Sequence, residues 1–327
     1  ARQGASQSVF DREYRAIFTA DSDSYYSAKK MVECTIPNGQ SPCMEIEGDN
    51  GSEYILSIDP SFSSAEHSDY FAMVILKIVK KDGKKIPLLV HCYAVAGGSL
   101  KDHTLYLYFL LKKFNVVYVA IDSSGGDSNE FINSSNNSKL FKDSKIELLD
   151  IQADFAKHDN SDLIKEIKKS YNLQQKRIVQ KQHFGAGNFL RSANEYMQGC
   201  FDRKNLMFAG KINSNANELS RISGTSMDIL KDHKSFKDID IEEFIEDQDN
   251  WIDVTKQECA LIEISTSALG TMSFDLPLSL RRSKQANRVR KDLYSALLLG
   301  NWAFKLYIEC LNEPEVKTFA TFAPFLG

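Results

Sequence analysis

The sequence lacks the features that mark membrane-spanning, disulfide-rich and P-loop proteins. No apolar run in the 327 residues approaches the roughly 20 residues that span a bilayer. The six cysteines are scattered and form no C-x-x-C pair, so we expect reduced, buried thiols and no zinc site. No G-x-x-x-x-G-K-[ST] motif is present, and the pairs Gly97-Gly98 and Gly125-Gly126 are too isolated to cradle phosphate. These absences exclude a membrane-spanning helix and a P-loop ATPase within these residues.

An excess of positive charge is also absent. The formal net charge is −4, which does not indicate nucleic-acid binding, so the local distribution of charge matters more than its sum. Five lysines between Lys77 and Lys85 surround an Asp-Gly turn, and their presence fits either a solvated face or phosphate contact. A second basic cluster runs directly into Asp292, which makes it the stronger candidate for phosphate contact. It comprises Arg281, Arg282, Lys284, Arg288, Arg290 and Lys291.

One apolar run ends in a carboxylate where a buried strand should end. Residues 54–58 favour a β-strand, and Pro60 cannot continue a central strand, so Asp59 should lie at the strand's end. A polar loop and a second apolar run from Tyr70 complete the pattern of a hairpin. Asp59 either starts an Asp-Pro turn or has a function, because an unpaired buried charge is costly.

Two further carboxylates occupy comparable positions. The β-favouring run 116–121 ends in Asp122, and Asp292 falls in the first turn of a strongly helical segment. Two strand-end carboxylates and one helix carboxylate suit a site for Mg²⁺ or another hard cation between sheet and helix, because such cations prefer oxygen ligands. Asp69 and Asp127 lie near the two strand ends, either as additional ligands or as solvated loop residues.

The order of apolar patterns predicts an α/β fold with a mixed sheet. Tight connections make the first three strands antiparallel, and the helix before the fourth strand makes that strand parallel to the first. Residues 127–145 are rich in Ser and Asn and predict a mobile loop. The predicted strands are 54–59, 70–79, 86–95, 116–121, 177–181 and 206–209, with an extended segment at 270–276. The predicted helices are 8–19, 100–114, 161–171, 187–200, 240–264 and 285–310.

These motifs resemble the nuclease domain of the large terminase subunit of tailed bacteriophages. The resemblance covers nearly the whole chain, and its order and spacing make it more specific than any single motif. The start of the chain, Phe10-Asp11-Arg12-Glu13-Tyr14 to Phe18, is similar to the segment that links the family's ATPase and nuclease domains. The other motifs are Ile58-Asp59-Pro60 with Asp69-Tyr70-Phe71-Ala72-Met73, Val119-Ala120-Ile121-Asp122-Ser123-Ser124-Gly125, and Arg290-Lys291-Asp292-Leu293-Tyr294-Ser295-Ala296-Leu297.

The resemblance implies an RNase H-like fold and cleavage of double-stranded DNA with Mg²⁺ or Mn²⁺. By motif position, Asp59, Asp122 and Asp292 would be the acidic triad that holds two metal ions, with Asp69 and Asp127 as further candidate ligands. One ion would activate water and the other would stabilise the leaving 3′-oxygen. The residues expected to bind DNA are Arg281, Arg282, Arg288, Arg290 and Lys291.

The resemblance also implies a role and partners. The substrate would be a concatemeric viral genome during packaging in the host cell cytoplasm, with no membrane involved. The partners would be duplex DNA, the terminase ATPase domain, the small terminase subunit and the portal protein. Because the chain carries no Walker motif, it would be an excised C-terminal domain, or its motor would be a separate chain. We expect a lead-in at 1–50, a nuclease domain at 51–312 with a loop or insertion around 127–171, and a tail at 313–327.

Three other readings fit parts of the sequence. Another RNase H-like nuclease, such as a resolvase or integrase, would use the same carboxylates on a different DNA shape. A non-catalytic packaging or docking module would keep its function without the three aspartates. A sugar-kinase or actin-like ATPase would need a glycine-rich phosphate turn, which 61–64 lacks and 123–126 provides only in part.

Overall fold

The computed structural model describes nine stretches of the chain, and the fold below concerns these alone. The predicted helices at 8–19 and 161–171, the basic residues Arg282 and Arg288, and the tail 313–327 lie outside them. The described stretches are 24–62, 69–125, 127–151, 176–185, 188–212, 228–231, 240–266, 272–281 and 289–312.

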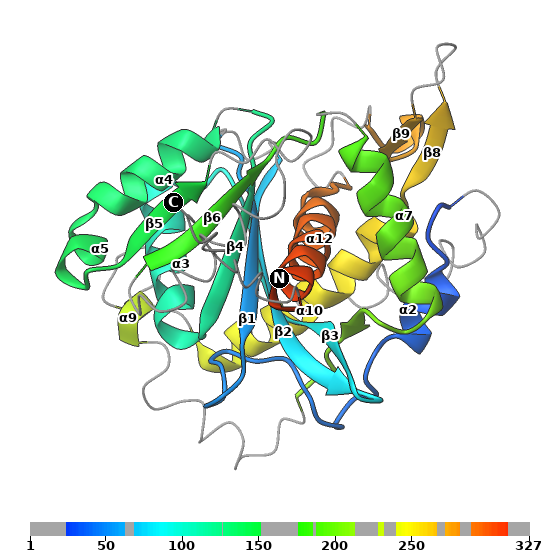
Figure 1. Ribbon diagram of the computed structural model, residues 1–327, viewed down its shortest axis with the longest axis horizontal. Helices are drawn as coiled ribbons and strands as arrows, with labels where there is room; N and C mark the ends of the chain where they lie inside the picture. Colours follow the sequence, from blue (N-terminus) through cyan, green and yellow to red (C-terminus); the bar gives the residue numbers. More distant parts are fainter. Residues whose placement is uncertain are drawn as a thin grey trace, which may run out of the picture.

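A seven-stranded mixed sheet forms the centre of the protein, in the order β5-β6-β4-β1-β2-β3-β7 (Figure 1). β1 pairs antiparallel with β2, and β2 with β3, whereas β4, β6 and β5 continue the sheet in parallel on the other side of β1. The predicted mixed sheet, three antiparallel strands and then parallel ones, is confirmed. The strands are β1 (Tyr54–Asp59), β2 (Tyr70–Lys81), β3 (Lys84–Ala96), β4 (Val116–Asp122), β5 (Glu147–Ile151), β6 (Lys176–Gln182) and β7 (Met207–Phe208).

The β2–β3 hairpin forms where the sequence predicts it. Asp82 and Gly83 both have positive φ, 49° and 76°, which is the conformation that an Asp-Gly hairpin turn requires. The long strands on either side are buried over most of their length. β2 also pairs with β1, and in that register Ala72 lies opposite Asp59.

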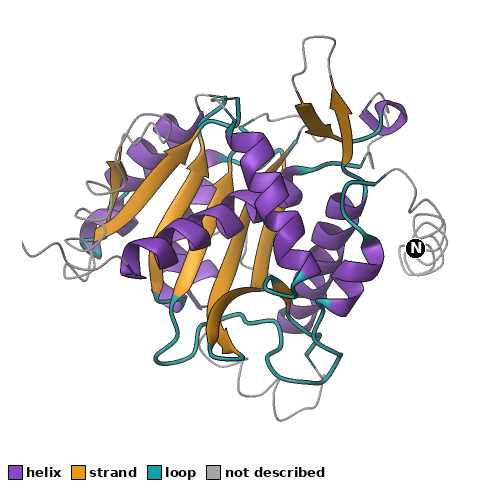
Figure 2. Ribbon diagram, turned by 45° about the vertical axis from the view of Figure 1, so that its right-hand side comes forward, coloured by secondary structure: helices purple, strands orange, loops and turns teal. Residues whose placement is uncertain are grey.

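Helices cover both faces of the sheet, as Figure 2 shows. α12 lies on the face that carries Ser57, whose Oγ donates a 2.7 Å hydrogen bond to the carbonyl of Ala296. The opposite face packs against α3 and α4, where Phe71 stacks on His103 and meets Phe131 edge to face. The helices are α2 (Ala28–Glu33), α3 (Leu100–Lys113), α4 (Asp127–Asn137), α5 (Lys139–Asp143), α7 (Phe189–Asp202), α9 (Asp228–Lys231), α10 (Ile241–Ala260), α11 (Leu278–Arg281) and α12 (Asp292–Asn312).

A second, two-stranded sheet projects from the body beside these helices (Figures 1 and 2). It pairs β8 (Glu263–Thr266) with β9 (Met272–Asp275) in antiparallel register, which agrees with the extended segment predicted at 270–276. No helix in the described stretches is both long and apolar enough to cross a membrane. Within those stretches five cysteines are free thiols, and four of the five are buried.

The predicted mobile loop at 127–145 is wrong. This part of the chain forms α4 and α5, anchored by the buried rings of Phe131 and Phe141. Its serines are interior residues: Ser128 and Ser135 are fully buried, and their small side chains let α4 approach α3 closely. Asn136 hydrogen-bonds both the N–H and the carbonyl of Leu148 in β5, at 2.8 and 2.9 Å. A run of Ser and Asn is typical of loops, but here the serines are buried in a helix and the asparagine hydrogen-bonds a strand.

Two other features differ from the sequence-based predictions. The long C-terminal helix was predicted from residue 285, but α12 begins at Asp292, and residues 289–291 precede it as coil. Lys77, the first lysine of the Lys77–Lys85 cluster, is buried and forms ion pairs with Glu45 and Asp49. Lys77 therefore belongs to the packing of the sheet rather than to a phosphate-binding surface.

Candidate active site

The fold brings Asp59, Asp122 and Asp292 from three distant segments to one edge of the sheet. Ile58 of β1 and Ile121 of β4 are partners in parallel pairing, so Asp59 and Asp122 follow as the next residues at the carboxyl ends of adjacent strands. Their side chains lie on the same face as Ser57, because alternate residues of a strand share a face. That is the face covered by α12, whose first residue is Asp292.

Asp292 is held in place by the backbone of β2. The N–H of Tyr70 donates a 2.6 Å hydrogen bond to Oδ2 of Asp292. Tyr70 is the first residue of β2, two positions from Ala72, the partner of Asp59. The bond therefore places the start of α12 beside the end of β1.

Burial raises the pKa of all three carboxyl groups, and repulsion from neighbouring carboxylates adds to the rise at Asp59 and Asp292. Burial raises the pKa of Asp59 well above its ordinary value, and the charges of Asp292 and Asp122 add to the rise. Burial likewise raises the pKa of Asp292 to about 7; the Tyr70 N–H opposes this rise and the charge of Asp69 adds to it. Burial also raises the pKa of Asp122, against hydrogen bonds from Ser124. Crowded carboxyl groups of this kind are typical of functional sites.

Positive charge near the three aspartates is modest. Lys291 lowers the pKa of both Asp59 and Asp292, and Arg290 lowers that of Asp292. Lys291 is shared, because its Nζ also lies 2.9 Å from Oδ1 of Asp275. A partly buried acidic cluster with only these two compensating charges among the described residues fits a divalent cation, and carboxylate oxygens are the ligands that Mg²⁺ and Mn²⁺ prefer. Across the described stretches, no group of three or more His, Cys, Asp or Glu side chains is arranged so that it could hold a metal ion.

The loop after β4 fixes the orientation of the Asp122 carboxylate. Oδ1 accepts hydrogen bonds from the N–H of Ser124 at 2.9 Å and from its hydroxyl at 2.7 Å. Oγ of Ser124 in turn accepts from the N–H of Phe184, which follows β6, at 3.0 Å. The ends of β4 and β6 are therefore joined through the side chain that orients Asp122.

A buried carboxylate on α10 supports the start of α12. Oε2 of Glu258 accepts a 2.9 Å hydrogen bond from the N–H of Tyr294, one of the donors that a helix N-terminus leaves without an intrahelical partner. Burial raises the pKa of Glu258 well above its ordinary value, and the charge of Asp292 adds to the rise. The sequence reading treated this helix as a packing element and missed Glu258, because a single Glu in an acidic helix carries no signal.

Solved structures similar to this chain include large terminases of phages and their nuclease domains. The large terminase nuclease of thermophilic phage G20c has 10% identity and a TM-score of 0.42, with 85% of this chain and 97% of that chain covered. The nuclease domain of the large terminase subunit gp2 of bacterial virus Sf6 has 7% identity and a TM-score of 0.38, over 89% and 99%. The large terminase of bacteriophage HK97 has 10% identity and a TM-score of 0.32, over 85% and 43%.

These structures belong to the family that the sequence motifs resemble. No family model and no curated protein sequence matches the chain. The function of this chain is therefore inferred from its own residues.

The predicted DNA-binding residues within the described stretches have different surroundings. Arg281 is exposed, and its Nη1 lies 2.8 Å from Oδ2 of Asp275, the carboxylate that also pairs with Lys291. Arg290 is only 6% exposed, with its guanidinium 4.1 Å from the centre of the Tyr70 ring. Arg290 therefore positions Tyr70 and the start of α12, and is poorly placed to reach a DNA phosphate in this conformation.

The two further candidate ligands, Asp69 and Asp127, also differ in their surroundings. Asp69 is exposed and close enough to raise the pKa of Asp292, so it lies at the rim of the acidic cluster. Asp127 is the first residue of α4, where an acidic side chain interacts favourably with the helix dipole. A structural role accounts for Asp127, whereas Asp69 keeps its place as a candidate additional ligand.

Two residues at the end of β6 were missed by the sequence reading. Gln182 is the strand partner of Asp122 and is buried; its Nε2 donates to the carbonyl of His183 at 3.1 Å. His183 follows as the first residue beyond the strand and is exposed. The run 177–181 was predicted as a strand, but nothing in the sequence shows that it lies beside β4.

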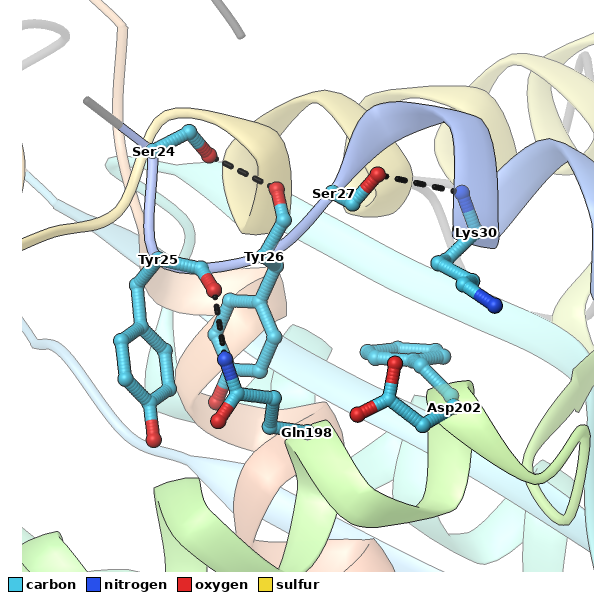
Figure 3. Close-up of a pocket in the computed structure, with 8 residues that line it drawn as sticks. Ser24, Tyr25, Tyr26, Ser27, Lys30, Gln198 and Asp202 are labelled. Atoms are coloured by element: carbon cyan, nitrogen blue, oxygen red, sulfur yellow. Dashed lines mark hydrogen bonds between the residues drawn. The ribbon is translucent and has the colours of Figure 1, made fainter. Parts of the chain in front are cut away.

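A cavity of about 200 Å³ lies apart from these residues, between the segment before α2 and α7 (Figure 3). The polar groups drawn there are largely satisfied within the wall. Ser24 Oγ donates to the Tyr26 carbonyl at 2.7 Å, and Gln198 Nε2 donates to the Tyr25 carbonyl at 3.1 Å. The cavity includes none of the acidic triad, and we assign no function to it.

Proposed function

We propose that this chain is a metal-dependent endonuclease that cleaves double-stranded DNA. The observation that supports this proposal best is the meeting of Asp59, Asp122 and Asp292. The three come from β1, β4 and α12; Asp292 is buried, Asp59 and Asp122 are partly buried, and the charges of Asp122 and Asp292 raise the pKa of Asp59. Carboxylates gathered in this way destabilise the folded protein when no cation is bound. Binding of a divalent cation would remove that cost, which is why we propose a metal site here.

Asp59, Asp122 and Asp292 would hold Mg²⁺ or Mn²⁺, and we propose two ions. When bound, such ions provide Lewis-acid chemistry that activates water and stabilises the leaving 3′-oxygen of a phosphodiester. The protein's own contribution is to fix the ligand oxygens. The Tyr70 N–H orients Asp292, Ser124 orients Asp122, and a hydrogen bond from Ser295 acts on Asp59.

The DNA backbone would be bound by positive charge near α12. Lys291 and Arg281 lie on either side of Asp275, and we propose Arg282 and Arg288 as further contacts from the same basic cluster. Arginine can hold a phosphate in a two-pronged fork, whereas lysine acts as a point charge. Because the whole chain carries a net charge of −4, affinity for DNA would depend on this local cluster.

We further propose that the reaction serves phage genome packaging. The support is the combined resemblance of the lead-in and the three acidic motifs to large terminase nuclease domains, in the same order along the chain. On this proposal the partners are duplex DNA, a terminase ATPase domain, a small terminase subunit and the portal, in the host cell cytoplasm. The domain limits proposed from the sequence remain 1–50, 51–312 and 313–327.

Plasmid cleavage tests the enzymatic part of this proposal. Wild-type protein should convert supercoiled plasmid to nicked and linear forms in Mg²⁺ or Mn²⁺ and not in EDTA. Asp122→Asn should abolish the reaction. Glu195→Gln, which changes an exposed carboxylate in an ion pair on α7, should leave cleavage unchanged.

The same experiment separates the alternatives. Folded protein that cleaves with neither metal would contradict the proposal and favour a non-catalytic docking module. Cleavage that prefers branched DNA over linear duplex would instead favour a resolvase-type nuclease with the same three carboxylates.

A further inference from the structure

The end of β6 adds a third strand to the edge where Asp59 and Asp122 lie. Asp122 of β4 and Gln182 of β6 are partners in parallel pairing, so His183 is the first residue beyond the strand that neighbours Asp122. Ligands of open α/β sheets bind outside the carboxyl ends of parallel strands, and His183 stands at that edge. It is exposed, so a ligand can reach it.

The position of His183 is fixed relative to Asp122 by two hydrogen bonds between the loops. The N–H of Ser123 donates to the carbonyl of Gln182 at 2.9 Å. The N–H of Phe184 donates at 3.0 Å to Oγ of Ser124, the hydroxyl that itself donates to Asp122. His183 lies between these two attachments, so its backbone cannot move independently of the Asp122 carboxylate.

The orientation and tautomer of the His183 ring are also fixed. The N–H of Gly185 lies 3.0 Å from Nδ1, and because a backbone N–H can only donate, Nδ1 must accept. The proton of a neutral imidazole then resides on Nε2. Glycine at 185 lets the turn lie this close to the ring, since a Cβ there would be 3.0 Å from Cε1 and 3.2 Å from Nδ1 and would push the ring away. The neutral ring therefore has Nε2–H as its donor, at the edge of the sheet where Asp122 lies.

We propose that His183 is a substrate-binding residue of this site, whose Nε2–H donates a hydrogen bond to a non-bridging oxygen of the DNA phosphodiester. The inference rests on the proposed function and goes further, because it adds β6 to the site and names the substrate atom that is bound. Cations bound by the three carboxylates would attract the DNA phosphate. A neutral N–H donor in a fixed position can orient that phosphate, and because it carries no charge it does not repel the cations.

Two substitutions separate phosphate binding from a merely structural role. His183→Gln places an amide N–H near the position of Nε2 and loses the acceptor for Gly185. His183→Asn keeps an acceptor near the position of Nδ1 and loses the distal donor. If His183 binds phosphate, Gln should restore activity and Asn should not; if His183 only supports the turn, Asn should restore it and Gln should not.

The decisive experiment compares wild type, His183→Ala, His183→Gln and His183→Asn in kcat and KM for duplex cleavage. It adds the Kd for duplex DNA in Ca²⁺ and the shift of Tm caused by Mg²⁺. We expect kcat to fall on the order of 10²-fold in the Ala and Asn variants and to recover in Gln, because losing one positioned donor has an effect of this size. The Kd should rise about 5-fold in Ala and Asn. The Mg²⁺-induced shift of Tm should be the same in all four proteins, since the metal ligands are untouched.

An Ala variant with wild-type kcat and Kd, or recovery in Asn rather than Gln, would overturn the inference and leave the proposed nuclease intact. Wild-type protein that cleaves with neither Mg²⁺ nor Mn²⁺ would instead overturn the proposed function. The Kd values would then decide the role of His183 by themselves, and equal affinities of wild type and Ala would refute it.

Discussion

The backbone N–H of Tyr70 donates a 2.6 Å hydrogen bond to Oδ2 of Asp292, and this bond joins the first residue of β2 to the first residue of α12. The two residues are 222 positions apart in the sequence. The hairpin that carries Asp59 and the helix that carries Asp292 are thus linked directly at the acidic cluster. The acidic group of α12 is positioned by the same strand whose register on β1 positions Asp59.

Substitution of Asp292 should separate catalysis from folding. Asp292→Asn should abolish cleavage and leave the free energy of unfolding in EDTA unchanged or increased. It removes a repelled charge but keeps an oxygen that can accept from Tyr70. Asp292→Ala removes the acceptor as well and should lower the free energy of unfolding by about 1–3 kcal/mol relative to Asn. Urea denaturation in EDTA, with and without added Mg²⁺, measures both effects.

The response to Mg²⁺ provides the control for this prediction. Wild type and Glu195→Gln should both be stabilised by Mg²⁺, and Asp292→Asn should not, because only the last variant lacks a proposed ligand. If Asn lowers stability strongly in EDTA, the carboxylate is structural and the metal site is refuted.

The positions of Asp59, Asp122 and Asp292 at the ends of their elements were predictable because each carries a local signal. Asp59 and Asp122 end apolar runs, and Asp292 opens a helical one, so a reader of the sequence can place each at the end of an element. The contributions of Glu258 and His183 were not predictable, since each depends on which elements are neighbours. A histidine after a short strand carries no sign that the strand pairs with the one ending in Asp122.

Local composition gave a wrong prediction where residues typical of surfaces or loops are buried by tertiary packing. Arg290 belongs to a basic run that predicts a surface, yet it is buried on the ring of Tyr70. Ser128 and Ser135 belong to a run typical of loops, yet they are buried in a helix. Arg290 and Ser135 contact side chains that are distant in the sequence, Tyr70 and Thr104, and no window along the chain can show such contacts.

The contact between α12 and β1 depends on a glycine. A Cβ on Gly300 would lie 2.5 Å from Ser57 Oγ and 2.9 Å from Leu76 Cδ1, both too close for an unshifted structure. Gly300→Ala should therefore lower the free energy of unfolding by about 1–3 kcal/mol, in spite of the better helix propensity of alanine. Chemical denaturation of the variant measures this difference.

Gly199 in α7 provides the matched control. There a Cβ would meet only the guanidinium of Arg203, at 3.0 Å from Nη1, and that flexible group can move away. Gly199→Ala should be neutral or stabilising by up to about 1 kcal/mol. The double variant Ser57→Ala with Gly300→Ala should be less destabilised than the sum of the single changes. Ser57→Ala removes the Oγ atom with which the new Cβ at residue 300 would clash. Equal effects at both glycines would show that α12 does not pack as closely as described.

Acid should destabilise the protein through His91. Its Nδ1 donates to the Glu45 carbonyl and its Nε2 accepts from the Tyr106 hydroxyl, both at 2.8 Å, so the native ring is neutral. Burial lowers the pKa of His91 to about 4 from an ordinary value near 6.5. The unfolded chain therefore binds a proton that the folded chain does not, and stability is lost as pH falls from about 6.5 to about 4.

The test compares wild type with His91→Asn, which can still donate to the Glu45 carbonyl but does not titrate. At pH 7.5 the variant should be the less stable protein, because the Tyr106 hydroxyl loses its hydrogen bond to Nε2 of His91. As pH falls below 6.5, the gap between the two free energies of unfolding should close by about 1.4 kcal/mol per pH unit. A gap that stays constant down to pH 4.5 would contradict a neutral buried His91.

Duplex binding in Ca²⁺, measured across a range of KCl concentrations, tests the proposed DNA surface. Arg281→Ala should weaken binding and reduce the log–log dependence of affinity on salt by about one, because one phosphate contact is lost. Lys84→Ala is the matched control. β2 begins at Tyr70 beside Asp292 and ends at Lys81, so exposed Lys84 at the start of β3 lies at the opposite end of the sheet from the acidic cluster. Its removal should leave the slope unchanged. If Arg281→Ala keeps the wild-type slope, Arg281 lies off the DNA path, and its pairing with Asp275 is structural.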